Sequence, residues 1–421
     1  MSDSLTFDPF DAAQTQHMWD RMREFRDRAP VARIGGGFVY VSRYADVQTV
    51  LRDQESFSNG GGMRPTGVEI PLHDASIGEL VPPVHPPVRR LALTAAHGGG
   101  IVERLRPEAR RVSEDLLTEL EAQGGGDLIA GLSLPLTNRV IGALLGVDRD
   151  TCDRLAGWSE QIMMSTLTVT NETERGVGYE GAFPEFTAFL DSLIDERSAD
   201  VAVDADAAER EADTITRIMR SGFESARLEP RVIRMILLNL VLGGTATTRD
   251  FLGNLLWVLL EDASLYEELH ADRNLISRAL DESLRHDPPV LYLIRTCTRE
   301  TELAGTTIAK GERVIAGLAS ANRDERVYDE PDQFRLDRVD PAQHMSFGYG
   351  PHFCVGSAMA KMEAEEAMSA LLDHFSPGTL RLDPQCTVEH MPLPYMLGPV
   401  RLSVRVGADR KYKHGFGVMP E

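Results

Sequence analysis

The stretch Phe347-Gly-Tyr-Gly-Pro-His-Phe-Cys-Val-Gly356 places one cysteine among glycines, directly before a long predicted helix. At the start of a helix, free backbone N–H groups and the positive end of the dipole stabilise a thiolate, so Cys354 is expected to bind a metal. Gly350 and Gly356 lack a Cβ and allow the backbone to approach a flat, bulky group. His352 can donate to an anion on that group. A single cysteinate and a large planar anionic cofactor together indicate a haem.

The same string contains Phe-x-x-Gly-x-His-x-Cys-x-Gly, and at every defined position, from Phe347 onward, it resembles the haem-binding signature of the cytochrome P450 family. The alternative, a structural cysteine in a glycine-rich turn, is the usual fate of a lone cysteine. The resemblance implies haem b (iron protoporphyrin IX) on Cys354. It also implies a mainly α fold with small β-sheets, in which the haem lies between a long distal helix and the helix that follows the cysteine loop.

Composition limits the remaining function classes. The chain has 421 residues and a formal net charge of −21, which argues against nucleic acid and against an anionic membrane surface as partners. Its four cysteines form no Cys-x-x-Cys pair, and the N-terminus has neither a signal peptide nor an anchor, so we expect a cytoplasmic protein. Without a repeat or a Pro-rich linker, residues 1–421 are expected to form one haem domain.

Hydrophobic periodicity predicts a mostly helical chain. The predicted helices are 101–122, 148–166, 181–197, 230–261, 263–286 with a break, and 356–375, and the predicted strands are 38–41, 294–298 and 314–318. Four Gly-Gly-Gly triplets, which start at positions 35, 60, 98 and 124, are expected to lie in loops.

Two further segments resemble structural motifs of the family. Glu282 and Arg285 are three residues apart and share one helical face. An exposed pair of this kind contributes little to stability. Here the order and spacing resemble the family's Glu-x-x-Arg helix, and Arg338 matches the arginine that completes its buried cluster. The resemblance implies that these three side chains fix the loop that presents the thiolate.

A haem brings two propionates into the protein, and these anions need cationic partners. Four basic residues stand where the family places such partners: His85 and Arg89 before and within one helix, Arg295 on a strand, and His352 in the cysteine loop. Each alone is more often a surface charge. Together and in this order they are expected to bind the propionates.

The distal candidate is the helix at 230–261. Gly243 and Gly244 each cost about 1 kcal/mol inside a helix, which is tolerable if the helix bulges open over the iron. The segment that includes them resembles the family's Ala/Gly-Gly-x-Asp/Glu-Thr-Thr/Ser motif, which implies that Thr247, followed by Thr248, steadies dioxygen and its protons. The alternative is tight helix packing at small residues, with a threonine bonded back to its own helix.

Ala246 departs from the family, most of whose members carry an acid at this position. A positioned acid typically contributes about 10²- to 10⁴-fold to rate. Three accounts remain open. Water ordered by Thr247 and Thr248 delivers the protons, or Asp250 substitutes for the acid, although the neighbouring Arg249 indicates a solvated pair. Otherwise a substrate group supplies the proton, or the chemistry is atypical, such as peroxide use, nitric oxide reduction or oxidative coupling.

The sequence has no flavin or nicotinamide fingerprint and no cysteines for an iron–sulfur cluster. We therefore expect a separate ferredoxin and ferredoxin reductase, which pass electrons from NAD(P)H. Such partners are usually acidic, so the docking face is expected to be a basic patch. Its candidate residues are Arg89, Arg90, Arg106, Arg110, Arg111 and Lys361.

By the same resemblance, the substrate pocket is expected to be lined by residues 59–80 (including Met63, Ile70 and His73), 163–170, 238–244, 290–294 and 390–396. The charged stretch 172–175 is expected to form either a mobile lid or, as is commoner, a solvated helix end. Most are apolar, which favours a hydrophobic small molecule. The leading hypothesis is a monooxygenase that uses dioxygen to hydroxylate such a molecule in secondary metabolism or catabolism. The alternatives are the atypical chemistries raised by Ala246, and a non-catalytic haem sensor, which the hydroxyl-bearing distal segment disfavours.

Overall fold

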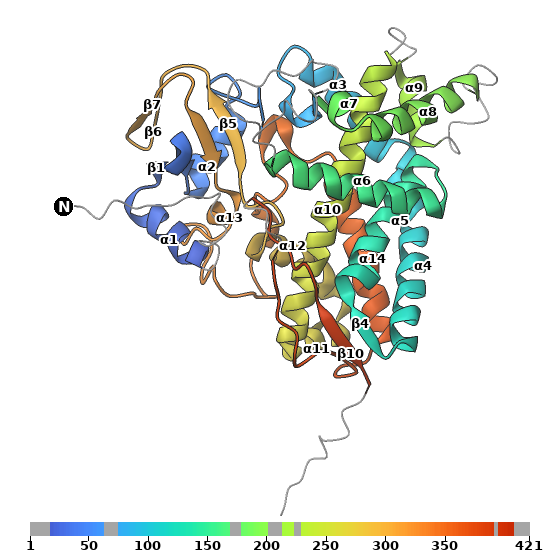
Figure 1. Ribbon diagram of the computed structural model, residues 1–421. Coiled ribbons are helices and arrows are strands. Elements are labelled where there is room, and N and C mark those ends of the chain that lie inside the picture. Colours follow the sequence, from blue (N-terminus) through green and yellow to red (C-terminus); the bar gives the residue numbers. More distant parts are fainter. Residues whose placement is uncertain are drawn as a thin grey trace, which may run out of the picture.

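The computed structural model describes residues 17–62, 75–168, 178–200, 213–222, 229–390 and 395–407. Most of this chain is helical (Figure 1). The helices are α1 (Met18–Arg28), α2 (Tyr44–Arg52), α3 (His85–His97), α4 (Ile101–Ala122), α5 (Leu134–Leu145), α6 (Arg149–Thr168), α7 (Gly178–Ala182), α8 (Pro184–Asp200), α9 (Thr214–Gly222), α10 (Pro230–Glu261), α11 (Ala263–Ala271), α12 (Ile276–His286), α13 (Leu318–Ala321) and α14 (Ser357–His374).

The strands form three small sheets. They are β1 (Val31–Ile34), β2 (Phe38–Val41), β3 (Phe57–Ser58), β4 (Gly125–Asp127), β5 (Leu293–Cys297), β6 (Thr301–Leu303), β7 (Thr306–Ile308), β8 (Arg313–Ala316), β9 (Leu380–Leu382) and β10 (Ser403–Val406). The largest sheet has the order β1-β2-β8-β5-β3, with β2 and β8 parallel and the other pairs antiparallel. It lies with α1 and α2 on one side of the molecule, while the long helices fill the other side (Figure 1).

Helix α10 runs through the middle of the helical half and positions the site (Figure 1). It begins with Pro230 in its first turn, where the missing N–H costs nothing. Leucine, isoleucine and valine occur on all its faces, and it packs against α5, α6, α8, α12 and α14. It ends where Asp262 leaves the helical conformation and its side chain caps α11 by accepting from Ser264 N–H.

The mainly α fold with small sheets is confirmed, and hydrophobic periodicity located its long helices well. The predictions 101–122 and 230–261 coincide with α4 and α10, and the break expected within 263–286 separates α11 from α12. The three predicted strands correspond to β2, β5 and β8, within one or two residues. Periodicity did not predict several other elements, α5 among them, and α3 was expected only from the resemblance of its His85 and Arg89 to a helix of the family.

One glycine triplet is not a loop. Gly124 has a positive φ, but Gly125 and Gly126 belong to β4, which pairs with β10. At Gly125 (φ +125°) an added Cβ would lie 2.3 Å from the carbonyl oxygen of Val404. Only glycine therefore allows β10 to approach this closely, and the triplet is a pairing device rather than a turn.

No single helix in the described ranges is long and apolar enough to cross a membrane. One bent pair of helices, Ile129–Leu145 with Arg149–Ile162, has the length and composition of a membrane span, and only these two properties support such a role.

Candidate active site

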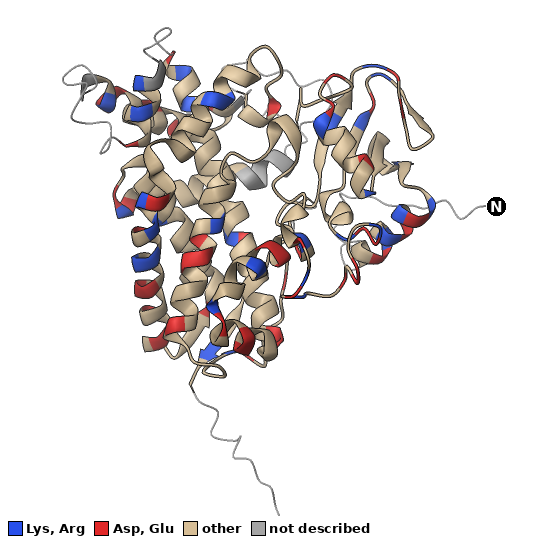
Figure 2. Cartoon of the chain, turned by 180° about the vertical axis from the view of Figure 1, so that it is seen from behind, with Lys and Arg blue, Asp and Glu red and all other residues tan. Residues whose placement is uncertain are grey.

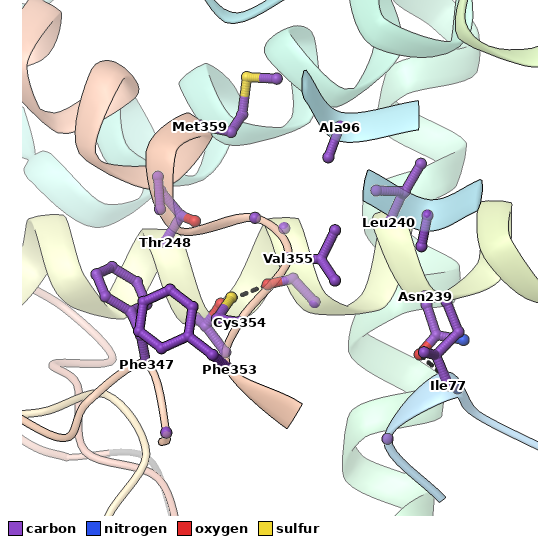
Figure 3. A pocket seen from close by; sticks show the side chains of 18 of the residues that line it. Ile77, Ala96, Asn239, Leu240, Thr248, Phe347, Phe353, Cys354, Val355 and Met359 are labelled. Atoms are coloured by element: carbon purple, nitrogen blue, oxygen red, sulfur yellow. Dashed lines mark hydrogen bonds between the residues drawn. The ribbon is translucent and has the colours of Figure 1, made fainter. Parts of the chain in front are cut away.

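The cysteine loop is held in shape before α14 begins. The backbone N–H of Cys354 donates to the carbonyl of Phe347 at 2.8 Å, which closes the loop on itself. Gly350 has φ +74°, and a Cβ there would lie 3.1 Å from the Cα of Arg52 in α2. Glycine is thus needed both for the backbone conformation and for the close approach to α2. The rings of Phe347 and Phe353 meet edge to face beside Cys354 (Figure 3).

The Cys354 thiol opens into a cavity at the N-terminus of α14. Its depth in the protein raises the thiol pKa above the ordinary 9.0, although the N–H groups of Gly356 and Ser357 and the guanidinium of Arg89 lower it. The local donors therefore favour a thiolate but do not by themselves compensate its desolvation. A metal cation on the sulfur would supply the missing stabilisation.

Four basic side chains from α3, β5 and the cysteine loop converge on the same region. His85 begins α3 and its ring stacks on that of His352, with ring centroids 3.8 Å apart. Arg89, one turn along α3, lines the cavity and its Nη2 donates to the carbonyl of Phe353 at 2.5 Å. Arg295 comes from β5, is 4% exposed, and donates through Nη1 to the carbonyl of Ile294.

These basic side chains lack acidic partners. In the part of the chain that the structure describes, no carboxylate pairs with His85, Arg89, Arg295 or His352, and two buried nitrogens, His85 Nε2 and Arg295 Nε, have no hydrogen-bond partner. Burial lowers the pKa of Arg295 to about 10. Burial, together with His85, Arg295 and Arg89, lowers the pKa of His352 to about 3. The two arginines supply positive charge and the two uncharged histidines supply ring N–H donors, which together fit a dianionic group such as the two propionates of a haem.

Glu282, Arg285 and Arg338 meet in a buried cluster, as the sequence predicts. Arg285 donates to both carboxylate oxygens of Glu282 at 2.8 Å, and the Nε of Arg338 lies 2.9 Å from both. The two guanidinium groups also donate to backbone carbonyls of the segment between α13 and the cysteine loop. Glu282 and Arg285 have no exposed surface. The cluster thus ties α12 to this segment.

The cavity has a volume of about 330 Å³ and is mainly apolar. Cys354, Phe347 and Phe353 gather in one part of it, and Ile77 and Asn239 lie toward the other end (Figure 3). Its apolar lining comes from α3, α5, α10, α13 and the chain around β5, and includes Ala92, Ala96, Ile141, Leu144, Ile236, Leu240, Val290, Leu293 and Leu318. From α10 it is lined by Gly243, Gly244, Thr247 and Thr248.

A family model described as Cytochrome P450 matches residues 9–406. The chain belongs to the cytochrome P450 family. Membership implies a haem iron, dioxygen, a substrate and redox partners, and it makes the protein an oxidoreductase of the monooxygenase type.

The relatives of this P450 are bacterial. The chain is 28% identical over 392 residues to a steroid C26-monooxygenase of Mycolicibacterium smegmatis, with 93% of this chain and 92% of the relative covered. It is 30% identical over 370 residues to the erythromycin C-12 hydroxylase of Saccharopolyspora erythraea, with coverage of 86% and 88%. Among solved structures, cytochrome P450 CYP109Q5 from Chondromyces apiculatus aligns with a TM-score of 0.83 and 26% identity, covering 96% of this chain and 99% of that one.

In this P450 the distal helix does not bulge. Helix α10 is continuous through Gly243 and Gly244, and the two glycines have different roles. A Cβ on Gly243 would meet nothing within 4 Å, so its absence leaves space in the cavity. A Cβ on Gly244 would lie 2.5 Å from Cδ1 of Ile141, so this glycine allows α5 to pack closely. Thr247 donates its hydroxyl hydrogen to the carbonyl of Gly243, which is the back-bonded arrangement.

Ala246 and Asp250 both lie away from the cavity. Ala246 is 7% exposed and packs in an apolar cluster with Leu291, Tyr395 and Leu397. The expectation of a solvated Arg249–Asp250 pair is wrong, because Asp250 is fully buried and accepts from Arg249 Nε at 2.7 Å. Burial, opposed by Arg249, raises the pKa of Asp250 to about 7. Its carboxyl group lies against Gly398 rather than along the cavity wall.

The predicted pocket is correct in part. Residues within 59–80, 238–244 and 290–294 line the cavity. Met63, Ile70, His73 and the possible lid at 172–175 lie outside the described residues, as do the side chains of 163–170 and residues 391–394. The sequence interpretation missed the α3 and α5 contributions, because small residues such as Ala92 and Ala96 carry no distinctive signal. It also missed Glu363, because acids are common on helices and only packing shows that this one lines the cavity.

The six candidate docking residues do not form a patch of unpaired positive charge. Figure 2 shows positive and negative residues alternating along α4. Arg106 pairs with Glu103, Glu365 and Glu366, and Arg110 pairs with Glu114 and Asp373. Arg111 pairs with Glu108 and Asp115, and Lys361 contacts Asp281. Since Arg89 lines the cavity, Arg90 alone of the six candidates is an exposed cation without a partner among the described residues.

Proposed function

We propose that this P450 is a haem-thiolate monooxygenase of the cytosol that hydroxylates a hydrophobic small molecule in secondary metabolism or catabolism. The observation that carries the proposal is the cavity itself. It combines the Cys354 thiol, a cluster of two arginines and two histidines without acidic partners, and an apolar lining that includes the hydroxyl-bearing segment of α10. A steroid monooxygenase and a macrolide hydroxylase among the relatives support substrates of this polarity.

Each part of the site has a defined task in this proposal. When bound, haem b would supply dioxygen activation, which an electron-donating thiolate ligand favours. Cys354 would hold the iron, and His85, Arg89, Arg295 and His352 would hold the propionates. Gly356 would leave room for the macrocycle, whereas Gly350 holds the cysteine loop against α2. The Glu282–Arg285–Arg338 cluster would keep the cysteine loop in register.

The distal wall would orient the substrate and exclude water. Gly243 leaves space in the cavity, and the Thr247 hydroxyl, already donating to Gly243, can still accept a hydrogen bond on its oxygen lone pairs. Asn239 lines the cavity, but its Oδ1 accepts from Ile77 N–H and its Nδ2 donates to the Met235 carbonyl. Because these polar atoms are engaged within the protein, substrate recognition would depend mainly on apolar shape.

Electrons would come from NAD(P)H through a separate ferredoxin and ferredoxin reductase. Since most candidate docking arginines are paired with acids, the partner would dock by local complementarity around Arg90 rather than on a broad basic face. Weak dependence of the association rate on salt is therefore expected, and a steep dependence would contradict this arrangement.

The function is tested by two measurements on the haem-loaded protein. The reduced carbon-monoxide adduct should give the spectrum of thiolate-ligated haem, and Cys354→Ser should abolish it. A spectrum typical of histidine-ligated haem would refute the assignment. Lipophilic compounds, with a steroid and a macrolide as the first probes, should displace the sixth ligand, whereas small polar compounds should not.

Ala246 supports one second candidate, a haem-thiolate enzyme with atypical chemistry such as peroxygenation, nitric oxide reduction or oxidative coupling. Apolar packing occupies the position where most of the family carries an acid. Turnover of the same probe with hydrogen peroxide and with NADPH plus ferredoxin decides between the two. The monooxygenase proposal predicts the faster product formation with the reductant.

A further inference from the structure

A segment near the C-terminal end of the described chain packs closely against the C-terminal half of α10. An added Cβ on Gly398 would lie 2.4 Å from Cγ of Asp250, and an added Cβ on Gly253 would lie 2.9 Å from Cγ of Pro399. Asp250 and Asn254 are four residues apart, so both lie on this face of the helix. Because neither glycine has room for a side chain, the segment has a fixed position on α10.

Asn254 joins this segment to a second one. Its Nδ2 donates to the carbonyl oxygens of Leu397 and Asp287, each at 2.9 Å. Both partners are acceptors, so only the NH₂ end of the amide can bind them, and both of its hydrogens are used. Asn254 is 1% exposed, and its Oδ1 has no hydrogen-bond partner among the described residues. The two donors, rather than the acceptor, therefore account for an asparagine at this position.

The two segments that the Asn254 amide binds are also paired with each other. The N–H of Leu291 donates to the carbonyl of Tyr395 at 2.8 Å, and the N–H of Leu397 donates to the carbonyl of Pro289 at 3.0 Å. Backbone hydrogen bonds in both directions join the segments into one unit, and Asn254 attaches this unit to α10.

This unit carries part of the cavity lining. It consists of residues 287–293 and 395–398, and we name it the bridged wall. Val290, which is bridged to Met396, lines the cavity together with Leu293. The distal residues of α10 line the same cavity. A shift of the bridged wall relative to α10 would therefore change the width of the cavity.

Ala246 allows the bridged wall to lie close to α10. It precedes Asp250 by four residues and thus continues the helix face that carries Asp250 and Asn254. It packs in an apolar cluster with Leu291 and Leu397, both from the bridged wall. A carboxylate at this position would be buried against leucine side chains at a large desolvation cost. The alanine thus has a packing role of its own.

We propose that Asn254 is a positioning residue that sets the width of the cavity and thereby selects which lipophilic molecules fit. It lies outside the cavity lining and acts through Val290 and Leu293 of the bridged wall. Ala246 provides the second attachment point, about two turns earlier on the helix. This inference rests on the proposed function and refines it, because it locates a determinant of substrate size.

The first test reads the attachment directly and needs no turnover. In the haem-loaded protein, Asn254→Leu should raise the hydrogen–deuterium exchange rates of the Leu291 and Leu397 amides at least about tenfold. The matched control is Asn322→Leu. Asn322 is a fully buried asparagine whose Oδ1 accepts from the N–H of Met345, before the cysteine loop. Its loss should raise exchange at Met345 and leave the bridged wall protected.

The second test measures the cavity with two iron ligands of different size. Imidazole and 4-phenylimidazole share one binding nitrogen, but only the phenyl ring must pack against the cavity walls. The ratio of their dissociation constants comes from the spectral shift of the haem. The preference for 4-phenylimidazole should fall at least about fivefold in Asn254→Leu and in Asn254→Asp, which both remove the donors. The control Asn322→Leu should keep the wild-type ratio.

Ala246→Val tests the other attachment point. It removes no hydrogen bond, but its extra methyl groups should push the bridged wall away from α10, so the preference for 4-phenylimidazole should fall here too. This variant keeps the test decisive if neither Asn254 variant takes up haem. An unchanged ratio in Ala246→Val would contradict a wall whose distance from α10 sets the cavity width.

The outcomes separate this inference from the proposed function. Wild-type exchange rates and a wild-type ratio in Asn254→Leu would overturn the positioning role. An equal fall of the ratio in Asn322→Leu would show a general loosening of the fold, and would overturn it as well. Neither result bears on the monooxygenase proposal, which an atypical carbon-monoxide spectrum of the wild-type protein would refute.

Discussion

The buried acids of this P450 fall into two regions that differ in how their charges are neutralised. Next to the cysteine loop, Glu282 is bound by two arginines and Asp287 by Arg323 and His286. Along α10 and α14, Asp250 and Glu363 each keep one buried oxygen without a partner. Buried groups are normally satisfied, so the first pattern is typical of a scaffold and the second needs a separate explanation.

The contrast shows how one fold can divide its tasks. Fully paired charges lock two segments together at a fixed distance, which suits the loop that carries Cys354. Unsatisfied buried acids and cations lower the stability of the protein, so their presence marks candidate sites for a bound group. The cation cluster around Arg295 and the acid Glu363 both belong to this second class.

The largest effect is expected in the paired region. Arg285→Leu would leave Glu282 with one guanidinium and remove the donors to three backbone carbonyls. We expect a loss of about 3–5 kcal/mol in the free energy of unfolding, because one member of a buried charge cluster is removed. Urea unfolding and haem content measure it. The control Arg335→Leu, which removes an arginine from exposed pairs with Asp337 and Glu330, should cost less than about 1 kcal/mol.

The pH dependence of stability should separate Asp287 from Asp250. Burial would raise the pKa of Asp287, but His286 and Arg323 outweigh it and the pKa is about 2. Its contribution is therefore present above pH 3.8, the unfolded value, and is lost as the pH falls toward 2. Asp250, with a pKa of about 7, behaves oppositely: stability declines as the pH rises from about 4 to 7, because the folded state holds the proton more tightly.

Variants at the two positions isolate these opposite slopes. Asp287→Asn should flatten the acid side of the stability curve, and Asp250→Asn should remove the decline between about pH 4 and 7. Isothermal urea unfolding across pH measures both. Identical slopes in wild type and Asp250→Asn would mean that Asp250 is a fully stabilised carboxylate and belongs with the scaffold acids.

The sequence predicts the paired region better than the unpaired one. Glu282, Arg285 and Arg338 stand in a motif with a fixed order, and their mutual contacts follow once they are buried. Ala246 is visible in the sequence as a departure, but Glu363 is not, because any helix carries acids and only packing shows which one faces the cavity. The prediction of a solvated Arg249–Asp250 pair was wrong for the same reason. Adjacent charged side chains favour solvent unless tertiary contacts enclose them.

Backbone irregularities show the same limit. The two adjacent glycines, Gly243 and Gly244, predicted a helix that bulges open, because glycine lowers the stability of a helix locally. The structural reasons lie outside the helix itself. Gly243 leaves space in the cavity, and Gly244 avoids a clash with Ile141 of α5. Likewise, the contact that requires Gly125 is made by β10, nearly 280 residues later in the chain.

In the unpaired region, Arg295→Leu should affect the protein without and with haem in opposite directions. Removing a buried cation that lacks an acid partner should leave the haem-free protein as stable as before or more stable. A haem would lose one charge-assisted hydrogen bond to a propionate, about 1.5–3 kcal/mol, and should dissociate roughly ten- to a hundredfold faster. Haem transfer to an acceptor protein measures the rate, and Arg299→Gln, an exposed arginine just beyond β5, is the control. Equal destabilisation of both forms would assign Arg295 to the scaffold.

The smallest effects are expected at the two adjacent glycines of α10. One of them allows close helix packing, and the other leaves space in the cavity. Gly244→Ala would place a Cβ 2.5 Å from Ile141 Cδ1 and should cost about 1–3 kcal/mol, and Ile141→Val should recover part of this loss. Gly243→Ala meets no atom and should stabilise the helix by up to about 1 kcal/mol. Its methyl group would nevertheless enter the cavity, so binding of the largest lipophilic probes should weaken while the thermal unfolding temperature rises. If both substitutions destabilised the protein equally, Gly243 would be a packing residue, and the cavity would not be the reason for its presence.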